Sequence, residues 1–537
     1  MSLTLPQALG QKLMLSFDGE TPSPDLLAVL QRQHVGGVTI FRHRNVANPA
    51  QVRLLTAALQ QAAAAAGQPP LVIAADQEGG TLLALAGTTL FPGNLALGAT
   101  RSAELARRTG QAIGRELAAM GINVNYAPVC DVAQNAGNPV VGTRSFGADP
   151  ASVAELSAAM IQGLQSAGVA ATPKHFPGHG DTVHDSHYGT PVLAYNPQTF
   201  DSVQIRPFRT AISAGARLMM TAHIAVPALS GGLELPATLS PEIIRGLLRR
   251  DLGFEGVVIT DAMNMQAMRQ GAGLPIDAIA AAAAGVDLLL LQNDSAETAA
   301  VYAGLVQAAQ RGLLAADDQF ASAERVLALK SWLSAQAQPA LDVVNCAEHQ
   351  ALAREVAGLA LTLVRDDTHR LPLRLPAQAR VAAIVPRPAD LTPADTSSYI
   401  HPALAAALRR HHPDVTEFIV PLDPDANEVS ALAEQMRRYD LVVMGTINAT
   451  VYAGQAALVN ALLARGLPVI AAALRMPGDL AAYPSAPTYL CTYSILEPAL
   501  DALAAALFGQ APCPGHLPIA IPGLYPLGHL ATDTVVS

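Results

Sequence analysis

The chain has few of the residues that most narrowly define a protein class. Its 537 residues include only four cysteines, and no two of them form a C-x-x-C pair: Cys130, Cys346, Cys491 and Cys513. We therefore expect neither a disulfide framework nor a cysteine zinc site. Charged residues make up 14% of the chain, the net charge is −10, and clusters of Lys and Arg with interleaved aromatics are lacking. This composition argues against nucleic acid as a partner.

Long hydrophobic runs are also missing, although 51% of the residues are hydrophobic. The longest runs, 278–284 and 286–291, are broken by Gly285 and Asp287 and are shorter than a membrane-spanning helix. We therefore expect no membrane partner. Residues 1–7 lack the basic and apolar regions of a signal peptide, and together with the scattered cysteines this favours the cytoplasm.

Short apolar runs alternate with longer helical patterns through the first 335 residues. The expected strands are 35–41, 71–75, 124–129, 169–173, 218–222, 257–260 and 286–291, and the clearest helices between them are 50–66, 102–120, 151–167 and 241–252. Repeated alternation of this kind predicts parallel strands with crossover helices. We predict an α/β fold with a (β/α)₈ barrel over residues 1–335, and a doubly wound open sheet is the alternative.

A second series of alternating helices and strands follows an expected linker at 336–346. A helix at 348–363 precedes expected strands at 381–385, 418–421, 441–445, 468–473 and 488–493, with helices such as 429–438 and 455–465 between them. This pattern predicts a C-terminal α/β sandwich domain over 347–537. Its notable polar residues, His401, Arg475, Asp479 and Tyr493, are interpreted as surface or turn residues, and 395–398 as a polar loop that lacks the glycine spacing of a phosphate cradle.

Polar residues of the first domain lie where its expected strands end. They are Asp76, Asp131, Lys174 with His175, His223 and Asp261. The strand starts carry glycine and proline instead. In a parallel barrel the carboxyl ends of the strands face one shared pocket, so this distribution favours the barrel over the open sheet and predicts a site at that rim.

The densest group of titratable residues is the stretch 174–187. It reads Lys-His-Phe-Pro-Gly-His-Gly-Asp-Thr at 174–182, followed after two residues by Asp185-Ser186-His187. So many histidines and carboxylates in one loop indicate a functional site. Metal binding by His175, His179, His184 and His187 is the competing interpretation. No helical zinc motif fits, because Pro177, Gly178 and Gly180 disfavour a helix, and we expect no metal and no cofactor.

The rim residues can support cleavage of a glycosidic bond. Asp261 would be an ionised nucleophile, and Asp185 can orient His187 and raise its pKa so that the imidazole donates a proton near neutral pH. A nucleophilic carboxylate with a proton donor is the pair required for cleavage through a covalent intermediate. The usual donor is a second carboxylic acid, so a histidine in this role would be a variant.

Several blocks of the sequence resemble those of a known protein family. The blocks that carry the resemblance are 174–187, Asp-Gln-Glu-Gly-Gly at 76–80, Gly-Thr-Arg-Ser-Phe-Gly at 142–147, 221–224 with 236–240, and 253–261. In this order they are similar to the β-N-acetylglucosaminidase branch of glycoside hydrolase family 3. Residues 473–477, 507–509 and 515–518 resemble the family's C-terminal sandwich more loosely.

The resemblance implies a retaining exo-β-N-acetylglucosaminidase acting on GlcNAc-terminated glycosides such as cell-wall fragments. It implies that Asp261 is the nucleophile and that His187, paired with Asp185, is the acid/base. Sugar hydroxyls would be bound by Asp76, Arg144, Lys174 and His175, and we add His223 as a candidate. Two positions depart from the pattern: Thr81 stands where many members carry Arg, and Ala262 follows the nucleophile where single-domain members often have Asp.

Three alternatives stay open from the sequence. The same histidine dyad could serve a phosphorylase, because a neutral imidazole does not repel phosphate as a carboxylate would. A non-catalytic carbohydrate-binding relative is remote, since Asp261, His187 and Asp185 are all present. The second domain could instead act as an interaction surface. The aglycone preference and the oligomeric state are not determined by the sequence.

Overall fold

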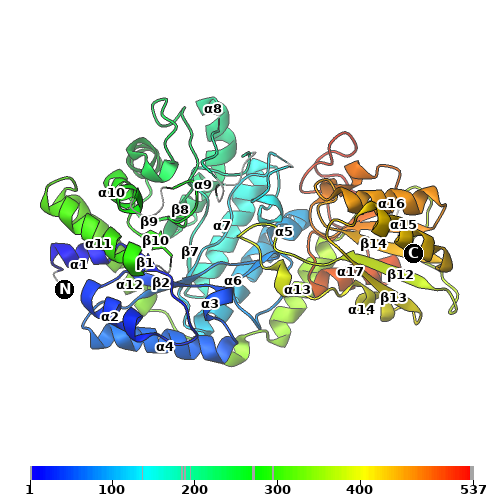
Figure 1. Ribbon diagram of the computed structural model, residues 1–537, viewed down its shortest axis with the longest axis horizontal. Coiled ribbons are helices and arrows are strands. Elements are labelled where there is room, and N and C mark those ends of the chain that lie inside the picture. The colour runs from blue at the N-terminus through cyan, green and yellow to red at the C-terminus, as the bar shows by residue number, and fades with distance from the viewer. Residues whose placement is uncertain are drawn as a thin grey trace.

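The computed structural model describes residues 3–135, 137–182, 186, 189–193, 195–268, 273–292 and 295–531. Figure 1 shows two bodies side by side: a helix-covered barrel in blue to green and a smaller sheet layered with helices in yellow to red. The expected α/β class, a barrel followed by an α/β sandwich, is confirmed.

Parallel strands close into the barrel. In chain order they are β1 (Leu13–Leu15), β2 (Gly37–Ile40), β3 (Val72–Ala75), β6 (Val124–Asn125), β7 (Ala170–Ala171), β8 (Leu218–Thr221), β9 (Val257–Thr260) and β10 (Leu289–Leu291). Each pairs with the next, and β10 pairs with β1, through ladders or through the parallel bridges Phe176–Thr221 and Ile259–Leu288. The ring is closed, so the carboxyl ends of all these strands open on one face.

Two expected strands are shorter than predicted because prolines interrupt their ladders. We predicted 124–129 and 169–173, but β6 ends at Asn125 and β7 ends at Ala171. Pro128 and Pro173 have no N–H to donate, and pairing resumes only at the bridge between Val129 and Lys174. The strand β1 was missed, since Leu13–Leu15 is too short to show a periodic pattern after the helix α1 (Leu5–Gly10).

The crossover helices cover the outside of the barrel. They include α2 (Pro24–Gln33), α4 (Pro49–Ala65), α6 (Ala103–Ala119), α7 (Pro150–Ser166), α9 (Arg206–Ser213), a π-helical segment at Glu242–Asp251, α10 (Leu274–Ala284), α11 (Ser295–Gln310) and α12 (Ala316–Ser334). The Asn48 side chain caps α4 and the Asp149 side chain caps α7, each directly before a proline at the first helical position. Both helices start within one residue of the predicted positions, 50 and 151.

The helices α6 and α7 approach each other closely through glycine. A Cβ atom added at Gly163 of α7 would lie 2.1 Å from the carbonyl oxygen of Arg107 in α6. A Cβ added at Gly110 of α6 would lie 2.5 Å from the carbonyl oxygen of Met160. Only residues without a side chain allow the two backbones to pack at this distance.

The second sheet has the strand order β11-β16-β15-β14-β12-β13. Its strands are β11 (Thr362–Asp366), β12 (Val381–Pro386), β13 (Val415–Val420), β14 (Leu441–Thr446), β15 (Val469–Ala473) and β16 (Thr488–Cys491), and only β11 is antiparallel. Its helices are α13 (Ala347–Ala360), α14 (Leu404–Arg409), α15 (Ala426–Gln435), α16 (Ala453–Ala464) and α17 (Glu497–Leu507). Successive residues of β12 alternate between two separate apolar clusters, one on each face, as a sandwich requires.

One expected element of the second body is wrong. We predicted a single helix over 348–363, but α13 ends at Ala360 and the last residues begin the edge strand β11. The run Leu361-Thr362-Leu363-Val364 continues the apolar pattern of the helix while being rich in β-formers, and its pairing with β16 decides the outcome.

The two bodies share apolar contacts. Leu83 of the barrel belongs to one core cluster of the second sheet, and Leu95, Ala96 and Ala99 around α5 (Asn94–Thr100) belong to the other. In return, Leu352, Ala353 and Val356 of α13 belong to the barrel core. The linker expected at 336–346 falls between the end of α12 at Ser334 and the start of α13 at Ala347.

Among the described residues, no helix is both long enough and apolar enough to cross a membrane bilayer.

Candidate active site

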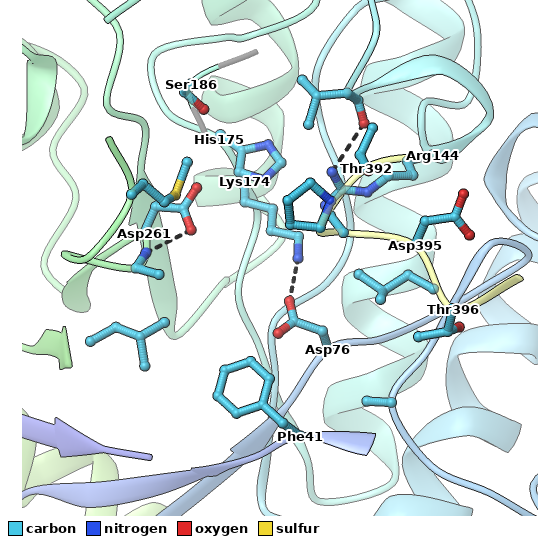
Figure 2. A pocket seen from close by; sticks show the side chains of 18 of the residues that line it. Phe41, Asp76, Arg144, Lys174, His175, Ser186, Asp261, Thr392, Asp395 and Thr396 are labelled. Atoms are coloured by element: carbon cyan, nitrogen blue, oxygen red, sulfur yellow. Dashed lines mark hydrogen bonds and ion pairs between the residues drawn. The ribbon is translucent and has the colours of Figure 1, made fainter. Parts of the chain in front are cut away.

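A pocket of about 560 Å³ opens at the carboxyl ends of the barrel strands. The barrel contributes side chains that follow β2, β3, β7 and β9, and the second domain contributes residues between Asp390 and Tyr399 (Figure 2). Of the residues predicted as sugar ligands or nucleophile, the pocket brings together Asp76, Arg144, Lys174, His175 and Asp261.

A charge network forms the floor of this pocket. The Lys174 Nζ atom lies 2.6 Å from an oxygen of Asp76 and 2.6 Å from an oxygen of Glu78. Arg144 donates two hydrogen bonds to the Glu78 carboxylate, of 2.9 and 2.7 Å. Glu78 is buried, whereas the side chain of Asp76 is 22% exposed. Asp76 therefore presents acceptor oxygens to the pocket, while Glu78 holds the two cations in place behind it.

The ionisation of the network follows from these pairs. Burial opposes the charge on Glu78, but Arg144 and Lys174 outweigh it and lower the pKa of Glu78 from 4.5 to about 2. Burial also opposes the charge on Lys174, and Asp76 with Glu78 raises the pKa of Lys174 above its ordinary value. Both groups are charged at neutral pH. Glu78 was not among the predicted site residues, although it stands in the same quoted block as Asp76.

A second network positions His175. Its Nδ1 atom lies 2.7 Å from an oxygen of the buried Asp131, and the backbone N–H groups of His175 and His179 both donate to the other oxygen. Burial would raise the pKa of Asp131, but the adjacent His175 and His179 hold it below its usual value. Asp131 lies at the rim as predicted, yet it does not line the pocket; it fixes the loop that carries His175.

His179 connects that loop to Ser186. Its Nε2 atom lies 2.9 Å from the Ser186 hydroxyl oxygen, and its Nδ1 atom lies 2.8 Å from the Thr182 hydroxyl oxygen. Burial, together with the nearby His175, lowers the pKa of His179 from 6.5 to about 4. A neutral imidazole can accept one hydrogen bond and donate the other, so His179 holds Ser186 at the pocket wall, where Figure 2 draws it.

The predicted acid/base residues Asp185 and His187, with His184, lie outside the described residues. Their assignment stays a prediction. Ser186, which separates Asp185 from His187 in the sequence, lines the pocket.

Asp261 stands directly after β9. Its backbone N–H donates to the carbonyl oxygen of Thr221, and its Oδ1 atom accepts a 2.7 Å hydrogen bond from the Ala262 N–H. In Figure 2 its carboxylate lies on the opposite side of the pocket from the second-domain residues Asp395 and Thr396, with Lys174 and Asp76 between them.

His223, predicted as a sugar ligand, is placed differently. The side chain is fully buried and is not part of the pocket lining. Its Nδ1 atom lies 2.8 Å from the Thr238 hydroxyl oxygen, and its Nε2 atom lies 3.1 Å from the carbonyl oxygen of Ala262. Because Ala262 follows Asp261, this position supports the turn that carries the proposed nucleophile.

The second domain supplies pocket residues that the sequence analysis did not assign to the site. Asp390, Thr392, Thr396 and Tyr399 all line the pocket. They lie more than a hundred residues after Asp261 in a loop without a motif, so only the three-dimensional packing of the two domains identifies them. The tip of the loop contacts Thr81, whose carbonyl oxygen accepts hydrogen bonds from the Thr396 N–H and hydroxyl.

The interpretation of second-domain polar residues as surface residues is wrong for three of the four, although Arg475 and Tyr493 do lie in bends after β15 and β16. Arg475, Asp479 and Tyr493 are buried, and only His401 is exposed. Arg475 follows β15 and donates a 2.7 Å hydrogen bond to Asp395. Residues that follow β12, β14 and β15 line a cavity together with barrel residues. A polar residue at the end of one of these strands can therefore contribute to the contact between the two domains.

No group of three or more His, Cys, Asp or Glu side chains suited to a metal ion occurs within the described ranges. Asp76 is paired with Lys174, and His175 is paired with Asp131.

A pocket that sets an aspartate against a network of hydrogen-bonding charges on a barrel rim is suited to sugar binding and glycosidic cleavage. Comparison with known families agrees, since residues 4–329 match the model of the glycosyl hydrolase family 3 N-terminal domain. The chain belongs to glycoside hydrolase family 3.

Several relatives cover most of the chain. It is 35% identical over 419 residues to β-hexosaminidase A of Pseudoalteromonas piscicida, covering 70% of this chain and 69% of that protein. It is 30% identical over 526 residues to a β-N-acetylglucosaminidase/β-glucosidase of Cellulomonas fimi, covering 93% and 91%. The structure of a family 3 β-N-acetylglucosaminidase from Paenibacillus sp. str. FPU-7 superposes with a TM-score of 0.92 at 38% identity, covering 97% and 99%. The resemblance to the β-N-acetylglucosaminidase branch is thereby confirmed.

Proposed function

We propose that this chain is a retaining exo-β-N-acetylglucosaminidase that removes terminal GlcNAc from β-glycosides such as cell-wall fragments. The observation that carries the proposal is the position of Asp261, which lines the same pocket as Asp76, Arg144, Lys174 and His175. The N-acetyl preference is supported by the relatives, whose names describe β-hexosaminidase and β-N-acetylglucosaminidase activities.

The proposed mechanism assigns one task to Asp261 and another to His187. The Asp261 carboxylate attacks the anomeric carbon, forming a covalent glycosyl-enzyme as the bond to the leaving oxygen breaks. His187, oriented by Asp185, protonates that oxygen and then removes a proton from the incoming water. This assignment is supported by Ser186, the residue between them in the sequence, which lines the pocket.

The charge network would orient the sugar before attack. Asp76 can accept hydrogen bonds from ring hydroxyls, while Lys174 and Arg144 can donate to the same oxygens. The buried Glu78 carboxylate pairs with both Arg144 and Lys174 and so fixes the positions of these two cations. Their remaining N–H groups can still donate to the sugar. Such preorganised donors cost little reorganisation during the reaction.

The first test is turnover of p-nitrophenyl β-N-acetylglucosaminide beside the β-glucoside, each with and without inorganic phosphate. Release of free GlcNAc regardless of phosphate supports the proposal. Phosphate-dependent formation of a sugar 1-phosphate would replace hydrolysis by phosphorolysis, and preference for the glucoside would refute the N-acetyl assignment.

We expect Asp261→Ala to lower kcat by about 10⁴-fold or more without unfolding the chain, since the covalent step is lost. Asp251→Asn, at an exposed carboxylate that pairs with Arg250, is the matched control and should leave kcat unchanged. An Asp261→Ala variant that keeps most of its activity would remove Asp261 from the mechanism.

His187→Ala should slow the cleavage of substrates with poor leaving groups most. Equal losses of activity across leaving groups would contradict its role as an acid.

A further inference from the structure

We propose that a loop of the second domain, residues 390–399, forms the end wall of the sugar pocket and thereby limits the enzyme to unsubstituted terminal sugars. This inference rests on the proposed function, because it concerns which sugar that pocket accepts. Its wall residues are Thr392 and Ala394, and we call the segment 390–399 the wall loop.

The direction of the bound sugar places the wall loop at the far end from the reaction. If the anomeric carbon lies at Asp261, the ring extends toward Asp76 and Lys174, which bind its hydroxyls. Figure 2 shows Thr396 beyond Asp76, on the side away from Asp261. The hydroxyls most remote from the anomeric carbon therefore face the wall loop.

The wall loop is held rigidly by its own side chains. The buried Asp395 carboxylate accepts from the Arg475 guanidinium at 2.7 Å, from the Ser397 hydroxyl at 2.6 Å and from the Leu391 N–H at 3.1 Å. Asp390 accepts from both the N–H and the hydroxyl of Ser398, at 2.7 and 2.8 Å. A loop held by this many hydrogen bonds does not readily give way to a larger ligand.

The barrel fixes the outer surface of the wall loop as well. The Thr396 N–H donates to the Thr81 carbonyl oxygen at 2.8 Å, and the Thr396 hydroxyl oxygen accepts from the Leu83 N–H at 2.9 Å. The Arg42 guanidinium lies over the Tyr399 ring at 4.4 Å, a cation–π contact between the two domains. The pocket end is therefore closed by packing between domains.

Behind the wall lies a second, smaller cavity of about 110 Å³. Four residues line both cavities and so form the partition between them: Val140, Arg144, Thr392 and Ala394. Three residues that line the smaller cavity each carry a buried polar atom for which the described part of the chain offers no hydrogen-bond partner: Thr143 Oγ1, Asn448 Oδ1 and Arg475 Nε. The partition separates the sugar pocket from this smaller cavity.

One side chain of the partition, that of Thr392, is suited to a shortening substitution that tests its role. Val140 and Arg144 belong to the barrel, and Arg144 is part of the charge network, whereas Ala394 has little to remove. Thr392 is half-buried on the wall loop and has a three-atom side chain. Replacing it by glycine removes the wall locally and joins the two cavities. Replacing it by valine keeps the branched shape and removes only the hydroxyl, so Thr392→Val is the matched control.

The experiment compares substrates that differ by one methyl group. The kcat/KM of p-nitrophenyl β-N-acetylglucosaminide is measured beside that of its 4-O-methyl and 6-O-methyl ethers, and the ratio of ether to parent is taken within each protein. We expect both ratios to be low in the wild type, and at least one to rise about tenfold in Thr392→Gly, equivalent to about 1.4 kcal/mol. Thr392→Val should keep the wild-type ratios.

Three outcomes would overturn the inference. These are a wild type that accepts both ethers as well as the parent, a Thr392→Gly variant with unchanged ratios, and a Thr392→Val variant whose ratios rise as in the glycine variant. Failure of the proposed function is seen separately, as a wild type that does not cleave the parent. If the wild type cleaves a different β-glycoside, the same ratios measured on the methyl ethers of that glycoside test the wall.

Discussion

At the scale of single residues, the pocket depends on charges that are buried behind it. Glu78 does not line the pocket, yet it contacts both Lys174 and Arg144 at 2.6 to 2.7 Å. Asp131 has the same relation to His175. In each case an ionised carboxylate out of reach of the substrate sets the position of a side chain within reach. Such pairs are costly to break, because removing one partner leaves the other buried and unpaired.

The ion pairs of Glu78 with Arg144 and Lys174 make the stability of the fold depend on pH. Because the pKa of Glu78 is lowered from 4.5 to about 2 in the fold, its contribution is fully present above pH 4.5 and is lost as pH falls toward 2. We expect the free energy of unfolding of Glu78→Gln to be about 3–5 kcal/mol lower than wild type at pH 7, with the difference shrinking below pH 4.5. Urea unfolding at several pH values measures both effects.

The control for this pH dependence is Glu234→Gln. Glu234 is exposed, and its substitution should leave the wild-type pH profile unchanged. If Glu78→Gln showed the same loss at pH 3 as at pH 7, the acid dependence would have to come from another group.

At the scale of elements, glycines decide how closely helices pack. Gly163→Ala would place a Cβ atom 2.1 Å from the Arg107 carbonyl oxygen and 2.8 Å from the Gln111 nitrogen, both of them backbone atoms of α6. Since the two helices must move apart, we expect the substitution to cost about 1–3 kcal/mol of stability. Thermal unfolding followed by circular dichroism measures the change.

Gly358 provides the opposite case within α13. An added Cβ meets nothing within 4 Å there. Gly358→Ala should therefore stabilise the chain by about 0.5–1 kcal/mol, because alanine loses less backbone entropy in a helix. Equal effects of the two substitutions would mean that helix propensity, and not the contact between α6 and α7, controls the Gly163 site.

The same scale shows what could be predicted from the sequence. The strand ends before Asp76 and Asp261 follow from local patterns and were predicted correctly, and the starts of α4 and α7 were predicted to within one residue. The strand β1 and the break between α13 and β11 could not be, because pairing with β10 and with β16 decides them. Residues 395–398 were interpreted only as a polar loop, and the role of the wall loop was missed for a related reason: it arises from contacts of Thr396 with Thr81 and Leu83, about 310 residues earlier.

At the scale of the whole molecule, the two domains complete each other. The barrel helix α5 (Asn94–Thr100) and the short strand β5 (Leu82–Leu83) place apolar side chains in the core clusters of the second domain. The second domain in turn closes the sugar pocket through its wall loop. Although family 3 relatives align with the barrel, the barrel of this chain has a face that is buried only when the second domain is present.

This mutual burial predicts the behaviour of a shortened chain. A chain ending at residue 346 would expose Leu83, Leu95, Ala96 and Ala99 and would lose the α13 residues that pack into the barrel core. We expect it to aggregate or to bind a hydrophobic dye strongly, and to have no measurable activity. A chain ending at residue 361 keeps α13 and should be more soluble. It should still cleave poorly, because the end of its sugar pocket is open. A soluble 1–346 chain with wild-type kcat/KM would show that the barrel is self-sufficient and that the second domain has no part in forming the pocket.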